Sequence, residues 1–141
     1  MGRKPASLIL AVAAALLLAG CLDDKPDKVV VNVAPTDYKD EIIASLKKGV
    51  FLKNDTIRVS NAFLSDPVLQ PVGKQQLYVA CVRYTAHGAH NEIGDAVRVG
   101  YFYGGHLNQI IPAQQGECDK AVYKPFAELN AFCTGIGCKK Q

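Results

Sequence analysis

The sequence predicts an α+β domain with an N-terminal helix, a mainly antiparallel sheet of about four strands, a short C-terminal helix and two disulfides. Three observations favour this class. An amphipathic helical segment precedes four strand-like runs, a short helical segment follows them, and four cysteines lie beyond residue 21. Helices that are separated along the chain from a run of strands are typical of an α+β fold.

Residues 1–20 are predicted to be a removable export signal. Arg3 and Lys4 precede an apolar run of 15 residues from Ala6 to Gly20. A membrane-spanning helix needs about 20 such residues, so the run fits a signal peptide better than a permanent span.

The end of this run carries a specific motif, Leu18-Ala19-Gly20-Cys21. It resembles the lipobox of bacterial lipoproteins, in which a branched apolar residue and two small residues precede the modified cysteine. The resemblance implies signal cleavage between Gly20 and Cys21, followed by acylation of Cys21, with palmitate a typical acyl group. Two or three acyl chains would make the attachment effectively irreversible, since each buried methylene contributes about 0.8 kcal/mol. The alternative is ordinary secretory cleavage near Ala19.

The residue after the lipidated cysteine influences sorting in well-studied Gram-negative lipoproteins, where Asp at that position favours inner-membrane retention. Here the position is Leu22, and Asp23 follows it. The resemblance therefore implies an anchor in the cell envelope on the periplasmic face of the outer membrane, with membrane lipid as the partner of acylated Cys21.

Residues 21–36 are predicted to comprise the lipidated cysteine and a flexible tether, because charged residues and prolines dominate the segment. The alternative for Val29 to Val33 is a short edge strand, although Pro26 and Pro35 bracket it closely. Residues 37–141 are predicted to form a single small domain, since about 105 residues suffice for one core and not for two.

The first helix is predicted between a cap at Thr36 or Asp37 and a stop at Gly49. Asp40 and Glu41 place negative charge in its first turn, which the helix dipole favours. The apolar residues that recur on one face at helical spacing are Tyr38, Ile42, Ile43 and Leu46.

Four strands are predicted after this helix. Their ranges are Thr56 to Leu64, Gln76 to Thr85, Ala96 to Tyr103 and His106 to Ile111. The second run is apolar on both faces, as expected for a central strand that is covered on both sides. Gly104-Gly105 predicts a type I′ hairpin turn, and a short helix is expected from near Pro125.

Cys81, Cys118, Cys133 and Cys138 remain once Cys21 is assigned to the anchor. An even number of cysteines in a small exported domain predicts disulfides, and four cysteines allow three pairings. We favour Cys81–Cys118 and Cys133–Cys138, since glycines in the second, short ring let the chain turn. A zinc site at Cys133 and Cys138 is the alternative, but no second pair has matching spacing.

The charge balance argues against nucleic acid as a partner. The full chain has a formal charge of +3, but without Arg3 and Lys4 it carries 14 basic and 13 acidic residues. A nearly neutral domain without a basic run lacks the electrostatic attraction that nucleic-acid binding requires.

Histidines supply one candidate metal site. His87, His90 and Glu92 lie in a polar loop and would need to converge with His106 to bind a metal with imidazole and carboxylate ligands. The spacing matches no established zinc motif, so we interpret them as solvated loop residues and predict neither a metal site nor a cofactor.

No catalytic motif such as Gly-x-Ser-x-Gly or a phosphate-binding loop is present. Parts of the second half, in Tyr78 to Tyr84, Tyr101 to Leu107 and Tyr123 to Phe126, resemble small Gram-negative lipoproteins of unknown activity. We therefore predict a non-enzymatic lipoprotein that contacts an envelope protein or has a structural role. The alternatives are a small-molecule or metal-binding module that uses the His87/His90 loop, and a small hydrolase.

Overall fold

The computed structural model describes residues 31–49, 51, 57–88, 94–135 and 138. The predicted export signal, its cleavage site at Gly20 and the anchor at Cys21 lie outside the described residues, as do His90 and Glu92.

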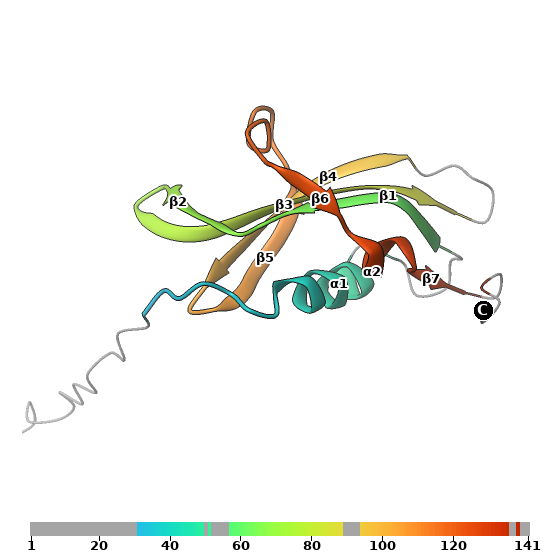
Figure 1. Ribbon diagram of the computed structural model, residues 1–141, viewed down its shortest axis with the longest axis horizontal. Helices are drawn as coiled ribbons and strands as arrows, with labels where there is room; N and C mark the ends of the chain where they lie inside the picture. The colour runs from blue at the N-terminus through green and yellow to red at the C-terminus, as the bar shows by residue number, and fades with distance from the viewer. Residues whose placement is uncertain (1–30, 50, 52–56, 89–93, 136–137, 139–141) are drawn as a thin grey trace, which may run out of the picture.

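The predicted α+β class is wrong, because the fold is mostly β. Strands contain 51% of the described residues and form one curled sheet of seven strands, where about four were expected. The strands are β1 (Ile57–Ser65), β2 (Val68–Val72), β3 (Gln75–His87), β4 (Asp95–Tyr103), β5 (His106–Pro112), β6 (Tyr123–Pro125) and β7 (Cys133–Thr134). Two short helices, α1 (Tyr38–Gly49) and α2 (Ala127–Asn130), accompany the sheet (Figure 1).

The strand order across the sheet is β5-β4-β3-β1-β6, and every pair is antiparallel. The 13-residue strand β3 is long enough to pair with two strands in succession along one edge. β2 pairs with its first part and β1 with its second part, while β7 pairs with the start of β1. The predicted strand from Gln76 to Thr85 is thus the centre of the sheet.

The helices cover one face of the sheet. α1 is the predicted first helix, and the carbonyl of Asp37 accepts its first helical hydrogen bond from the Glu41 N–H at 3.1 Å. Ile42 and Leu46 are fully buried, as the helical spacing predicted. Leu129 from α2 is also fully buried in this core.

The opposite face of β3 and β4 carries a second, smaller core. Its buried residues are Leu77, Val79, Cys81, Val99 and Tyr101. Residues 113–122, which follow β5, cross over this face, and Ala113, Cys118 and Ala121 pack against it (Figure 1). β3 is therefore covered on both faces, which confirms the interpretation of its apolar pattern.

Two features of the backbone depend on left-handed residues. Gly104 and Gly105 have φ values of 61° and 85°, which confirms the predicted type I′ turn between β4 and β5. Asn61 has a φ of 51° at a bulge in β1, where the register against β3 shifts between Ser60 and Phe63. Asparagine tolerates this conformation better than other side-chain-bearing residues do.

Candidate functional site

Both favoured cysteine pairings are present. Cys81 and Cys118 form a disulfide with a Cα–Cα distance of 5.9 Å, and Cys133 and Cys138 form one with a Cα–Cα distance of 5.7 Å. A disulfide uses the thiols that a zinc site at Cys133 and Cys138 would need, so the structure excludes that alternative. The first disulfide joins the central strand to the crossing segment and defines the site described next.

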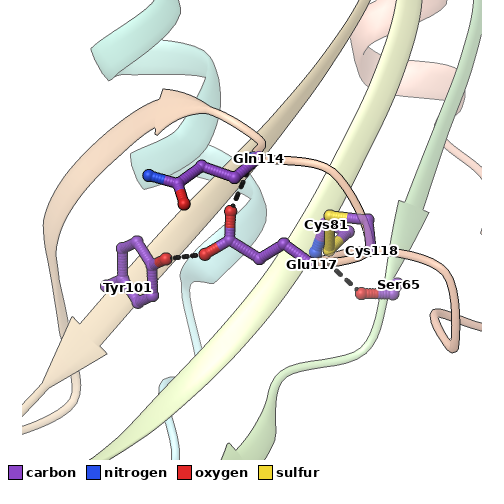
Figure 2. Close-up of a disulfide and its surroundings, with 6 residues drawn as sticks. All are labelled: Ser65, Cys81, Tyr101, Gln114, Glu117 and Cys118. Carbon is purple, nitrogen blue, oxygen red and sulfur yellow. Dashed lines mark hydrogen bonds between the residues drawn. A yellow bond between two sulfur atoms is a disulfide. The ribbon is translucent and has the colours of Figure 1, made fainter. Parts of the chain in front are cut away.

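Cys81 lies on β3 opposite a gap between β2 and β1, the two strands that pair in succession along one edge of β3. The register of β2 against β3 begins at Val79, and that of β1 ends at Val82, so no strand partner faces Cys81 along this edge. The Ser65 hydroxyl fills the gap, because its oxygen accepts the Cys81 N–H at 2.9 Å (Figure 2). Ser65 is itself buried, and this bond satisfies a polar group in the interior.

Glu117, next to Cys118, holds the crossing segment a second time. Its carboxylate accepts a hydrogen bond from the Tyr101 hydroxyl and another from the Gln114 N–H, the latter at 2.9 Å (Figure 2). Burial, together with this hydrogen bond to the carboxylate, raises the pKa of Tyr101 to about 12. The segment is held a third time where Tyr123 pairs with Ser65 in the sheet.

A hollow of about 480 Å³ lies between β2 and the crossing segment. Its lining residues are Ser65, Asp66, Val68, Gln70, Val79, Cys81, Glu117, Lys120, Ala121 and Val122. Val79 and Cys81 belong to the buried core of this face, so the base of the hollow is apolar and fixed by the sheet.

The rim of the hollow combines exposed valines with charges. Val68 on β2 is 60% exposed, and Val122 on the crossing segment is 76% exposed. Asp66 pairs with Lys124, whose hydrogen bond holds the pKa of the Asp66 carboxyl below its ordinary value. Lys120 is exposed. An apolar depression with exposed apolar residues and a polar rim is suited to binding the apolar side chains of a partner.

The structure keeps apart the two described histidines of the candidate metal site, His87 and His106. His87 ends β3, whereas His106 begins β5, and the nine residues of β4 span the length of the sheet between them. That distance is about 30 Å of extended chain. His106 Nδ1 instead lies 2.8 Å from Glu41 Oε1 on α1. Within the described part of the chain, no three His, Cys, Asp or Glu side chains are grouped as metal ligands.

His87 has a partner that the sequence did not suggest. Its Nε2 lies 2.9 Å from the Ser60 hydroxyl on β1. Beside this pair, Asn61 donates a side-chain hydrogen bond to the Thr85 hydroxyl at 3.4 Å, and Thr85 donates to Asp95 at 2.6 Å. The bulge in β1 sets which of these side chains meet, and a bulge leaves no periodic signal in the sequence.

Apart from Cys81, the residues that line the hollow were not identified from the sequence. Glu117 could have been placed near the sheet, because it precedes Cys118 and the favoured disulfide brings that cysteine to Cys81. The contribution of Val68 was not foreseen, since β2 was not predicted as a strand.

Comparison with known proteins gives no relative from which a role could be carried over. No protein-family model, curated protein or solved structure matches the chain. Among the described residues, neither helix has the length and apolar character needed to cross a bilayer.

Proposed function

We propose that the chain is a lipid-anchored lipoprotein of the bacterial envelope that binds another protein through the hollow beside the Cys81–Cys118 disulfide. The anchor is acylated Cys21, and the motif Leu18-Ala19-Gly20-Cys21 supports it. The membrane would be the outer membrane, on its periplasmic face, as Leu22 suggests.

The observation that carries protein binding is the pair of exposed valines across the hollow. Val68 and Val122 expose most of their surface to solvent at the margin of an apolar depression, although apolar side chains of this kind are ordinarily buried. Exposed apolar residues that gather at one place on a surface and are flanked by charges mark interaction sites.

The rigidity of the hollow supports the same role. The disulfide, the Tyr101–Glu117 hydrogen bond and the pairing of Tyr123 with Ser65 each hold the crossing segment against the sheet. A surface that is already ordered loses little conformational entropy when it binds a partner. Membrane attachment also raises the effective concentration of the domain near other envelope proteins, so a modest affinity is sufficient.

Site-specific crosslinking in cells tests the proposal. A photoreactive amino acid replaces Val122, which lines the hollow. In the matched control it replaces Val97, which is 43% exposed on the same strand face as Val99. Val97 is not among the residues that line the hollow. We expect one dominant crosslinked protein from position 122 and not from position 97. We also expect Cys21→Ser to weaken that crosslink. The same abundant neighbours from both positions would refute binding at the hollow.

A further inference from the structure

The side chain of Asn32 connects the N-terminal segment to two hairpins at once. Its amide nitrogen donates to the Gln76 carbonyl at 2.6 Å, and its amide oxygen accepts the Gly104 N–H at 3.2 Å. Gln76 lies beside the β2–β3 turn, and Gly104 lies in the β4–β5 turn. The segment from which the anchor extends is therefore fixed to one end of the sheet.

Neighbouring residues add to this attachment. Pro35 is buried, and Val33 lies beside the β4–β5 turn, where its Cγ2 would be 3.1 Å from a Cβ placed on Gly105. Figure 1 shows residues 31–36 at the end of the molecule that carries both turns, with β7 near the opposite end. Asn32 and Val33, which the sequence assigned to the tether, thus contact the turns at this end of the sheet.

The length of chain outside the structure limits how far this end can lie from the membrane. Ten residues separate Cys21 from Asn32. Fully extended, the eleven Cα–Cα steps from Cys21 to Asn32 span at most about 40 Å, and less in any other conformation. The turn-bearing end is therefore the end of the domain from which the chain leads to the anchor.

The surface of this end has the chemistry of a membrane interface. Val31, which precedes Asn32, is 69% exposed, and Val33, beside the β4–β5 turn, is 49% exposed. Tyr103, the last residue of β4 before that turn, is 42% exposed. Lys74 is exposed in the β2–β3 turn. Tyrosine is enriched at the headgroup level of bilayers, and lysine near an anionic bilayer is attracted to its surface.

We propose that the turn-bearing end is a lipid-contact surface, and that Asn32 holds the domain with both turns against the headgroups of the anchoring membrane. This inference rests on the acylation of Cys21 in the proposed function. In this orientation the sheet stands away from the bilayer. Val68 at the hollow lies at the end of β2 remote from the Gly73 turn, so the hollow stays open to a partner.

The test uses the full-length acylated protein, purified in detergent and reconstituted into phosphatidylethanolamine–phosphatidylglycerol vesicles that contain a headgroup-located nitroxide quencher. A fluorophore is attached to Lys74→Cys at the turn. The matched control is Lys47→Cys near the other end of α1, where Lys47 lies over the Phe132 ring at 5.2 Å. We expect stronger quenching at position 74 than at position 47.

Asn32→Ala should remove most of this difference, because two ordinary hydrogen bonds shift an equilibrium between attached and detached segments on the order of tenfold. Asn108→Ala, which removes an exposed amide from β5, should keep the difference. Binding of the protein to the vesicles is measured separately by flotation. Equal quenching at both positions in protein that floats with the vesicles would overturn the lipid-contact surface without contradicting the anchor. Failure of the unlabelled protein to float would instead refute the anchor.

Discussion

The Tyr101 hydroxyl donates a hydrogen bond to the Glu117 carboxylate and thereby ties the middle of the sheet to the segment that crosses over it. Tyr101 is a buried residue on β4, and Glu117 precedes the cysteine that is bonded to β3. The bond and the disulfide therefore hold the same segment to two neighbouring strands. This double attachment shapes one side of the hollow.

The first prediction concerns the ionisation of Tyr101. Its pKa in the folded protein is about 12, raised from an ordinary value of 10.0, so folding favours the protonated phenol. The stabilisation is fully present below pH 10 and is lost as the pH rises toward about 12. We expect a decrease in the free energy of unfolding over that range, measured by urea denaturation at fixed pH.

Tyr101→Phe provides the control for this prediction. The variant should be less stable than the wild type at neutral pH and should show a smaller decrease above pH 10. An ultraviolet titration should also lose the tyrosine that ionises last. If wild type and variant lost stability in parallel over the alkaline range, the assignment to Tyr101 would be wrong.

The elements that could be predicted from the sequence are those whose signals are local. α1 has acidic residues in its first turn and a helical apolar stripe, and β3 has apolar residues on both faces over ten predicted positions. The Gly104-Gly105 turn needs positive φ at both residues, which glycine adopts readily. Each of these signals is complete within one segment of the chain.

The elements that were missed depend on distant partners. β6 and β7 contain three and two residues, too few for a periodic pattern, and they are strands because both pair with β1. β2 contains Pro71, and proline is disfavoured within strands, yet β2 pairs with β3 through the turn at Gly73. These three short strands account for the error in fold class.

Pro71 also bears on how a partner can bind. In a hairpin with a two-residue turn, Val72 and Gln75 exchange hydrogen bonds, so the backbone at Pro71 faces away from β3. Proline has no N–H to offer an added strand at that outer edge. On the edge of β5, the Leu107 N–H is already bonded to Glu41. Binding through side chains at the hollow is therefore favoured over strand addition.

The second prediction compares the two disulfides. Their sequence separations are 37 and 5 residues. In the chain-entropy treatment, loops of these lengths contribute about 4 and about 2 kcal/mol. Cys81→Ala with Cys118→Ala should therefore lower the free energy of unfolding about twice as much as Cys133→Ala with Cys138→Ala. Chemical denaturation measures both losses, and a larger loss for the short ring would contradict the argument.

The third prediction concerns the left-handed residue in β1. A side chain that is branched at Cβ is strained at the φ of 51° that Asn61 adopts, whereas glycine is not. Asn61→Val should cost about 1–3 kcal/mol of stability. Asn61→Gly should stay close to wild type, since it loses only a long hydrogen bond to Thr85. Asn108→Val, at a residue whose φ is not positive, controls for the loss of an asparagine. Equal effects of valine at both positions would argue against strain.

The fourth prediction concerns how α2 holds the same bulge. The Asn130 side-chain oxygen accepts the Ala62 N–H at 2.8 Å, and its nitrogen donates to the Ala62 carbonyl at 3.4 Å. Ala62 is fully buried, and the shifted register leaves it without a partner in β3. Asn130→Ala would leave a buried N–H unsatisfied and should cost about 1–3 kcal/mol.

Asn130→Asp separates this hydrogen bond from other effects at the site. Aspartate keeps the oxygen that accepts the Ala62 N–H, so the variant should recover most of the stability that alanine loses. Hydrogen exchange at the Ala62 amide gives a local measurement, with faster exchange expected in Asn130→Ala than in Asn130→Asp. Because Phe126 also donates its N–H to the Ala62 carbonyl at 2.9 Å, that carbonyl stays satisfied in every variant. A stability loss in Asn130→Ala without faster exchange at Ala62 would place its cause elsewhere in α2.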